Sequence, residues 1–511
     1  MLTMNENTLP AFKDLVFYEI YPNSYKDADG DGYGDLKGII SKLDEIKEMG
    51  FNAIWLNPIY DSPFRDGGYD VRDPYKVSPR YGTNEDLKEL VQKCHENGIR
   101  LFLDLVPGHM SVTNKEFLRS AEGRPNEDYD LFIWNDNPWV LENGYRLISG
   151  CYDRYGCFMV NFFAHQPAIN YGFNKIEYPS WQTSYKETSH GRHYLEGIMK
   201  FWLDYGIDGF RCDMADSLVK NDDEKRTGTI WEWQTIRKEL AAEGYKDYYL
   251  TSEWSYPALA LQAFDSDFVL DHISNFSHKL FRNTEEGNKK PLLKEFNTEV
   301  YREFLADLKE RVKASRESKK YLSLISGNHD TTRIANYLSG NELKLAYLFI
   351  LTMPGVPYIY YGDEIGMHAD LTLPSAEGGY QRTGTRMPMR FDHTKNAGFS
   401  SSDHTFLPTN ENDPTLEDQK NDPSSLYNVI KTLISIRKED KDLRSDAFSL
   451  QEGIFGYKRG KDKVYINLLD DNQVFHQDKH YKVIFAIGDV HFERGDLVLG
   501  KKSGALIREE R

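Results

Sequence analysis

Eight short apolar segments alternate along this chain with stretches of helical periodicity. The segments are Val16–Tyr21, Ala53–Asn57, Arg100–Val106, Gly209–Cys212, Tyr248–Ser252, Phe268–Leu270, Leu322–Ser326 and Tyr358–Tyr361. After the first of them, apolar residues recur at helical spacing from Leu36 to Met49, and Gly50 stands where a helix commonly ends. Because strands that alternate with helices pair in parallel, the pattern predicts an α/β fold, a (β/α)8 or TIM barrel.

Acidic residues follow three of these predicted strands. Asp213 comes after Gly209–Cys212, Glu253 after Tyr248–Ser252, and Asp330 shortly after Leu322–Ser326. The C-terminal ends of all strands of such a barrel open onto one face, so the three carboxylates are expected in one site. Two carboxylates that flank a glycosidic bond suffice for retaining hydrolysis, because one attacks the anomeric carbon and the other protonates the departing oxygen.

Two parts of the chain depart from the alternating pattern. Residues 107–188 are too many for a strand-to-helix loop, and they predict an inserted subdomain after the third strand. From about residue 445 onward, short alternating strands predict a small all-β domain of the sandwich type. The expected division is a barrel of residues 1–106 and 189–440, an inserted subdomain of residues 107–188, and a C-terminal domain of residues 441–511.

Composition and charge narrow the function classes. The net charge of −17 argues against nucleic acid or an anionic membrane surface as the main partner. The first ten residues lack the basic and apolar regions of a secretion signal, and no apolar run is long enough to span a membrane. Four cysteines in a chain of 511 residues do not form a disulfide framework. We expect a soluble, cytoplasmic protein, and the oligomeric state is left open.

Six ordered motifs carry a family resemblance. They are Asp104–His109, Gln166–Asn170, Gly209–Asp213, Ser252-Glu253, Asn328–Asp330 and Gly355–Gly366. Together they resemble glycoside hydrolase family 13, the α-amylase family, over most of the chain. The resemblance implies that Asp213 is the nucleophile, that Glu253 is the general acid/base, and that Asp330 steadies the distorted sugar. Arg211, two residues before Asp213, supplies a cation that lowers the pKa of this carboxyl group.

Further residues are implied to bind the sugar. In Gly68-Tyr69-Asp70, the tyrosine would stack on the terminal sugar and Asp70 would bind its hydroxyls. Arg386 lies in a motif similar to that of oligosaccharide-specific members, in which the arginine pairs with this aspartate and closes the pocket. Phe162 either walls the pocket or belongs to the core of the inserted subdomain.

The histidines of two motifs are also implied to bind sugar. His109 and His329 would donate hydrogen bonds to sugar hydroxyls. The first motif has Gly108 where the family usually has asparagine, so we expect no calcium ion between the barrel and the inserted subdomain. Met214, directly after Asp213, leaves the preference for α-1,4, α-1,6 or other linkages undecided.

An acidic loop follows the first strand. Its oxygen ligands, at alternate positions and including one backbone carbonyl, are Asp27, Asp29, Asp31, Tyr33 and Asp35. This spacing suits Ca²⁺, although Gly38 stands where an EF-hand would need glutamate. A similar loop occurs in oligosaccharide-active members of the family. We therefore expect a structural Ca²⁺ ion with no catalytic part, with Mg²⁺ and a simple acidic turn as the alternatives.

The sequence leaves three functions open. The first is a retaining α-glucosidase that acts on short α-glucosides, such as malto- or isomalto-oligosaccharides. The second uses the same residues for transglycosylation or isomerisation, as in a glucanotransferase, a trehalose synthase or a sucrose-active enzyme. The third is a non-catalytic amylase-like domain, which needs neither the carboxylates nor a working pocket. The carboxylates at all three strand ends favour an enzyme.

Overall fold

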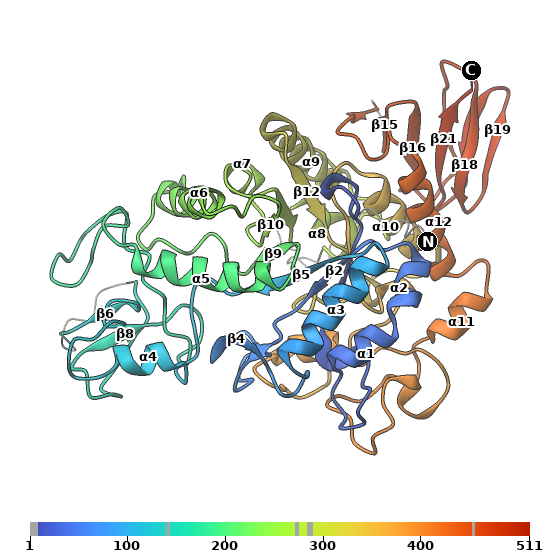
Figure 1. The fold of residues 1–511 in the computed structure, drawn as a ribbon. Coiled ribbons are helices and arrows are strands. Elements are labelled where there is room, and N and C mark those ends of the chain that lie inside the picture. The colour runs from blue at the N-terminus through green and yellow to red at the C-terminus, as the bar shows by residue number, and fades with distance from the viewer. Residues whose placement is uncertain are drawn as a thin grey trace, which may run out of the picture.

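Eight parallel strands in the middle of the molecule form a barrel (Figure 1). The computed structural model describes residues 9–137, 139, 144–270, 275–283, 290–451 and 455–510. Neighbouring strands follow the order β12-β11-β10-β9-β5-β2-β1-β13. A parallel bridge between Ile325 and Tyr358 joins the two outermost strands and closes the barrel. The predicted (β/α)8 architecture is confirmed.

The barrel strands coincide closely with the predicted segments. Their bounds are β1 Phe17–Ile20, β2 Ala53–Leu56, β5 Arg100–Leu105, β9 Gly209–Cys212, β10 Tyr249–Ser252, β11 Ser266–Val269, β12 Tyr321–Leu324 and β13 Tyr358–Tyr360. The sixth, β11, begins two residues before the predicted Phe268. Its first residues are polar but buried. Their burial is tolerated because the Ser266 hydroxyl hydrogen-bonds the Thr251 hydroxyl at 2.9 Å and the Asp267 carboxylate accepts a hydrogen bond from the Ser252 hydroxyl at 2.7 Å. Hydrophobic patterning overlooks such paired polar residues.

Helices surround the barrel. The longer ones are α3 Asn84–Glu96, α5 His190–Asp204, α6 Thr227–Ala242, α9 Thr298–Ser318, α10 Gly340–Thr352 and α12 Leu426–Glu439. The shorter ones are α1 Leu36–Ser41, α2 Leu43–Met49, α4 Lys115–Ser120, α7 Pro257–Ala260, α8 Phe276–Phe281 and α11 Leu416–Asn421. Six 3₁₀ helices cover Phe12–Asp14, Pro22–Ser24, Ile334–Asn336, Asp363–Ile365, Tyr380–Arg386 and Lys395–Gly398.

The first predicted helix is divided in two. The amide of Lys42 donates to the Ile39 carbonyl, an i to i−3 bond that tightens the last turn and ends α1. The second half ends as expected, with Gly50 in the left-handed conformation at φ 96°. The predicted start at Thr83 is a capping box, in which Thr83 and Asp86 satisfy each other's backbone amides.

A small subdomain projects from the barrel between β5 and α5, at the left of Figure 1. It holds α4 and a three-stranded antiparallel sheet of β6 Trp134–Asn135, β8 Cys157–Met159 and β7 Leu147–Ser149. Phe117 of α4 packs against Phe132, Trp134 and Phe158, so this part has aromatic packing of its own. The hairpin strands β3 Tyr60–Asp61 and β4 Asp73–Val77 lie in the loop after β2.

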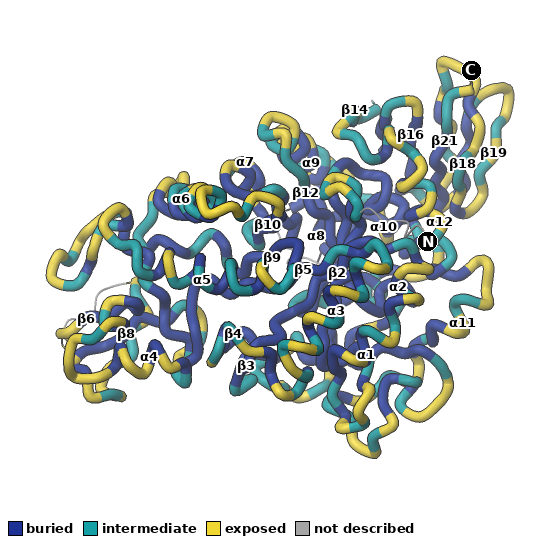
Figure 2. Tube along the Cα trace, viewed as in Figure 1, coloured by how far each residue is buried: buried dark blue, intermediate teal, exposed yellow. Residues whose placement is uncertain are grey.

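The C-terminal part consists of two antiparallel sheets, upper right in Figure 1. The strands are β14 Ser449–Leu450, β15 Gly456–Arg459, β16 Asp462–Ile466, β17 Gln473–Phe475, β18 Tyr481–Ile487, β19 Val490–Glu493, β20 Asp496–Leu499 and β21 Gly504–Glu509. Phe455 packs on Phe304 of α9 and Phe349 of α10, so the sheets share buried apolar surface with the barrel helices. Figure 2 shows that the barrel strands are buried and that exposed segments lie around the outside of the molecule. The exact domain boundaries at residues 106, 188 and 440 stay predictions.

Two findings concern the whole described chain. None of its described helices combines the length and apolar character needed to cross a membrane. The four cysteines, Cys94, Cys151, Cys157 and Cys212, are all free thiols.

Candidate active site

A pocket opens at the carboxyl ends of the barrel strands. It is lined by Asp66, Tyr69, His109, Phe162, Asp213, Met214, Asp216, Glu253, Trp254, Leu270, Asp330 and Arg382. The three predicted carboxylates are thus brought together in one pocket, along with the predicted Tyr69, His109 and Phe162.

Strand pairing positions Asp213 and Glu253. The strands β9 and β10 are parallel neighbours, and Cys212 of one is paired with Ser252 of the other. Asp213 and Glu253 directly follow these paired residues, so they leave the barrel at the same level. The amide of Met214 donates to the Glu253 carboxylate at 2.9 Å and fixes its orientation.

One buried guanidinium group connects the acidic side chains. Arg211 forms ion pairs with Asp104 at 2.8 Å, with Asp213 at 3.0 Å and with Glu253 at 2.7 Å. It lies two residues before Asp213 on β9 and therefore points to the same side of the strand. Arg211, which was predicted to influence Asp213, thus contacts both catalytic candidates. It also contacts Asp104, whose side chain was not among the predicted site residues.

The pocket separates the pKa values of its carboxyl groups. Burial raises the pKa of Glu253 to about 8 and that of Asp213 to about 7, while Arg211 opposes both shifts. Burial also acts to raise the pKa of Asp330, but His329, Arg382 and Arg386 outweigh it and hold that pKa below its ordinary value. The expected lowering by Arg211 is present, although burial dominates at Asp213. A proton therefore binds to Glu253 before it binds to Asp213, and Asp330 stays ionised.

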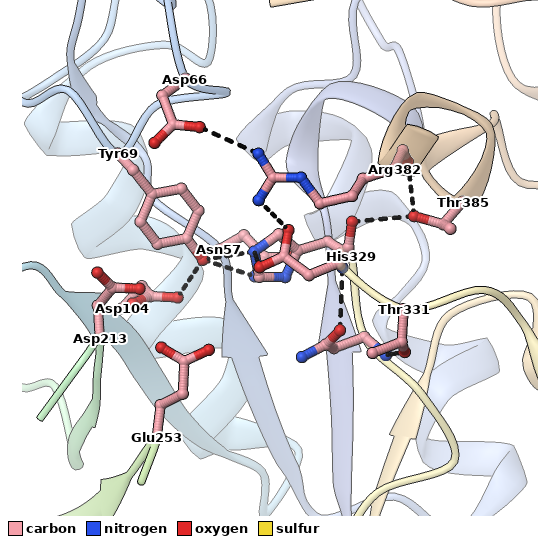
Figure 3. A network of polar contacts seen from close by, with 12 residues as sticks. Asn57, Asp66, Tyr69, Asp104, Asp213, Glu253, His329, Thr331, Arg382 and Thr385 are labelled. Atoms are coloured by element: carbon pink, nitrogen blue, oxygen red, sulfur yellow. Dashed lines mark hydrogen bonds and ion pairs between the residues drawn. The ribbon is translucent and has the colours of Figure 1, made fainter. Parts of the chain in front are cut away.

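Two arginines close the inner side of the pocket at Asp330. Arg382 contacts the Asp330 carboxylate at 2.9 Å and that of Asp66 at 3.4 Å, so it bridges two acidic residues (Figure 3). Arg386 also contacts the Asp330 carboxylate at 2.9 Å and donates to the His329 carbonyl at 3.0 Å. Both arginines belong to the 3₁₀ helix Tyr380–Arg386.

The predicted pair of Asp70 and Arg386 is wrong. Asp70 is fully buried, and its carboxylate accepts hydrogen bonds from the Ser62 hydroxyl at 2.9 Å and from the amides of Arg65 and Asp66 at 3.0 and 3.1 Å. These bonds hold the loop in its conformation and use both carboxylate oxygens of Asp70. Between Asp66 and Asp70, the residue that faces the pocket and meets an arginine is Asp66, and its arginine is Arg382.

A sequence signal for Asp66 existed in the glycines that follow it. Gly67 and Gly68 have φ values of 57° and 105°, which favour glycine, and they turn the chain so that Asp66 and Tyr69 both reach the pocket. A Cβ atom at Gly67 would come within 2.6 Å of the Arg386 guanidinium. The two adjacent glycines indicated a tight turn at this place, and the structure shows that the turn brings the backbone close to Arg386.

The two histidines have different places. His109 lines the pocket, and its ring contacts the Tyr69 carbonyl at 3.2 Å and the Asn161 amide at 3.3 Å. His329 is fully buried behind Tyr69, and its Nε2 atom is hydrogen-bonded to the Tyr69 hydroxyl at 2.8 Å (Figure 3). Its Nδ1 atom is hydrogen-bonded to Glu19 at 3.0 Å. Both nitrogens of His329 are thus occupied within the protein, and the predicted direct bond from His329 to a sugar is not supported.

Tyr69 is held in place by polar contacts at the tip of its ring. Its hydroxyl donates to the Asp104 carboxylate at 2.9 Å, and its ring is stacked on His329 with centroids 5.3 Å apart (Figure 3). Phe162 lines the pocket with 44% of its surface exposed, which favours a wall of the pocket over the core of the inserted subdomain.

The acidic loop before α1 gathers carboxylates. One oxygen each of Asp27, Asp29 and Asp35 lies within 4.8 Å of the others, whereas Asp31 is not part of this group. Asp31 instead accepts a hydrogen bond from the amide of Tyr33 at 2.8 Å. Asp27 and Asp35 also accept hydrogen bonds from backbone amides, and the three carboxylates are donors of the type that a hard divalent cation prefers.

Known proteins resemble the chain over nearly its full length. The model of the α-amylase catalytic domain matches residues 19–446. A glucan 1,6-α-glucosidase of Streptococcus pneumoniae is 30% identical over 87% of this chain and 88% of its own length. A trehalose synthase/amylase of Mycobacterium tuberculosis is 29% identical over 86% of this chain and 78% of its own length.

Solved structures agree on the fold. An isomaltulose synthase of Erwinia rhapontici superimposes with a TM-score of 0.80 and 24% identity, covering 99% of this chain and 100% of that one. The family match covers most of the barrel, and it includes every residue of the pocket. The chain therefore belongs to the α-amylase family, glycoside hydrolase family 13, and is a glycoside hydrolase.

Proposed function

We propose that the protein is a retaining α-glucosidase that removes single glucose units from short α-glucosides. The observation that carries the proposal is the pocket in which Asp213 and Glu253 share Arg211, with the Asp66–Arg382–Asp330 bridge on its far side. A terminal sugar bound against this bridge leaves no room for further sugars beyond it. The pocket therefore suits a chain end better than the middle of a polymer.

The first half of the proposed reaction forms a covalent glycosyl-enzyme. The ionised Asp213 attacks the anomeric carbon while Glu253 gives its proton to the departing glycosidic oxygen. The order of the two pKa values supports this division of labour, because the group with the higher pKa holds the proton. The Met214 amide keeps the Glu253 carboxyl group oriented during the transfer.

The second half releases the sugar with retained configuration. Glu253, now ionised, takes a proton from water, and the water attacks the anomeric carbon from the side the leaving group occupied. Asp330 stays ionised throughout, as its arginine partners ensure, so it is suited to bind sugar hydroxyls and to stabilise developing positive charge. Asp66 and His109 are the further candidates for hydroxyl binding, and Tyr69 offers the stacking surface.

The acidic loop supports a structural ion. We propose Ca²⁺ held by Asp27, Asp29 and Asp35, whose oxygens converge, with the Tyr33 carbonyl as a further ligand of the hard type that Ca²⁺ prefers. The loop residues are absent from the pocket lining, so the ion takes no part in the reaction. A cytoplasmic location is proposed as well, supported by the four free cysteines.

An isomerase or transglycosylase remains the second candidate. It is favoured by the relative named trehalose synthase/amylase, which is similar over 86% of this chain. Such an enzyme would use the same glycosyl-enzyme and pass the sugar to an acceptor sugar in place of water. Asp216, Met214 and Trp254 line the pocket beside the catalytic pair, where an acceptor would lie.

A disaccharide panel separates the two candidates. Maltose, isomaltose, sucrose and trehalose are each incubated with the enzyme, and products are followed by proton NMR before mutarotation. Sucrose and trehalose have no free reducing end, so for these two substrates the proposal expects α-glucose as the first product, with an Asp213→Asn variant as the inactive control. Initial β-glucose from sucrose or trehalose would contradict retention, and a new disaccharide formed without free glucose would establish the isomerase in its place.

A further inference from the structure

A second cluster of titratable side chains lies outside the active site, between helices α5 and α6. His193 and Glu196 stand three residues apart on α5, and therefore on one face of the helix. Glu239 comes from α6. One nitrogen or oxygen atom from each of the three lies within 4.8 Å of the other two, and His193 Nε2 is 3.7 Å from the Glu239 carboxylate.

The surroundings of the cluster carry an excess of negative charge. The guanidinium group of Arg192 donates to both oxygens of Glu232, at 3.2 and 3.0 Å, and reaches Glu239 only through Nε at 3.3 Å. One arginine thus faces two carboxylates. Among the residues that the structure describes, no ion pair reaches the third carboxylate, that of Glu196.

Glu196 is the side chain that most needs a partner. It is 3% exposed, and its Oε1 atom has no hydrogen-bond partner. A buried carboxylate without a partner is costly, and two adjacent carboxylates must share either a proton or a cation.

We propose that His193, Glu196 and Glu239 form a binding site for a divalent transition-metal ion, for which Zn²⁺ is the best fit. One imidazole nitrogen and two carboxylate oxygens are a ligand set that zinc accepts, and water would complete a tetrahedron. His193 has 59% of its side chain exposed, so it has room to close onto an ion. The ion would give the buried Glu196 oxygen the partner it lacks.

The position of the site indicates its consequence. The helices α5 and α6 come directly before and after β9, the strand that Asp213 directly follows. An ion bound to both helices would cross-link α5 and α6, the two helices that flank β9 in the chain. It would stabilise the folded enzyme through mass action, because the unfolded chain does not bring the three ligands together.

Calorimetric titration of the full-length protein with ZnCl₂ tests the site, with excess CaCl₂ present to occupy the acidic loop near Asp27. Wild type should show one saturable zinc site, and zinc should raise its melting temperature. His193→Ala should weaken zinc binding at least tenfold and abolish the thermal shift. His491→Ala, which removes a histidine of β19 whose side chain is 51% exposed, should bind as wild type does and serves as the matched control.

Two results would overturn the proposal. One is the absence of a saturable zinc site in wild type, or a site that His193→Ala leaves unchanged. The other is a Glu196→Gln variant whose melting temperature rises while wild type shows no response to zinc, because this would assign the carboxylate pair to a shared proton. The exposed position of His193 makes misfolding of the first variant an implausible cause of lost binding.

Discussion

Two aspartates four residues apart in the loop after β2 are expected to respond to the same substitution in opposite ways. Asp66 lines the pocket and meets Arg382, whereas Asp70 is fully buried and accepts bonds from the loop backbone. Asp66→Asn should therefore lower kcat/KM with little effect on stability. Asp70→Asn should lower stability, and its effect on kcat/KM should be much smaller.

The magnitudes follow from the contacts. A hydrogen bond to a charged group contributes about 1.5–3 kcal/mol, so loss of the Asp66 charge should reduce kcat/KM by roughly 10- to 150-fold. Asp70 accepts bonds from the Ser62 hydroxyl and from two backbone amides. An asparagine has a single acceptor oxygen and leaves at least one buried donor unpaired, which costs about 1–3 kcal/mol of folding free energy.

The assay pairs kinetics with thermal unfolding. Both variants are measured with maltose and isomaltose for kcat/KM, and by calorimetry for the melting temperature. Asp70→Asn should melt a few degrees below wild type, on the order of 2 °C for each kcal/mol. The reasoning is refuted if Asp70→Asn loses activity at an unchanged melting temperature while Asp66→Asn stays near wild type, because Asp70 would then be the sugar-binding residue.

Three further predictions concern pH, metal and the inner wall of the pocket. The profile of kcat/KM against pH should be bell-shaped, because activity falls below about pH 7 as Asp213 takes up a proton and above about pH 8 as Glu253 loses one. A profile that does not change with pH would contradict the assigned roles. In metal-free protein, added CaCl₂ should raise the melting temperature of wild type and not that of Asp29→Asn, and equal shifts in both would count against the calcium loop. Arg386→Ala removes one cation from Asp330 and should raise KM for disaccharides more than for longer substrates, as steady-state kinetics on a maltose-to-maltopentaose series would show.

The barrel and its three carboxylates were predictable because strand identity and strand ends are local properties. Apolar runs mark the strands, and the C-terminal end of every strand faces the same way. The positions of Asp213 and Glu253 could therefore be predicted without knowledge of contacts distant in the sequence. The start of β11 was missed because Ser266 and Asp267 become acceptable inside the barrel only through bonds to Thr251 and Ser252 on the neighbouring strand.

Loop residues could not be placed in the same way. Neither hydrophobic periodicity nor strand polarity says which of Asp66 and Asp70 turns toward the pocket, since this depends on the backbone conformation of the two intervening glycines. Likewise, the motif that contains His329 gives no sign that its ring lies behind Tyr69. That position follows from Glu19, on β1 more than 300 residues earlier in the chain, which holds the ring from the other side.

The register of two strands sets the spacing on which the proposed stereochemistry depends. Neighbouring strands lie roughly 4.8 Å apart, and carboxyl groups about 5–5.5 Å apart distinguish retaining glycosidases from inverting ones, which need a wider gap for water. Since Asp213 and Glu253 follow the paired residues Cys212 and Ser252, the strand register places their backbones about one strand spacing apart. A one-residue insertion between Arg211 and Asp213 would break this alignment and turn Asp213 away from the side of the strand on which Arg211 lies. The proposed retention thus depends on the pairing of β9 with β10, which sets the starting point of both carboxylates.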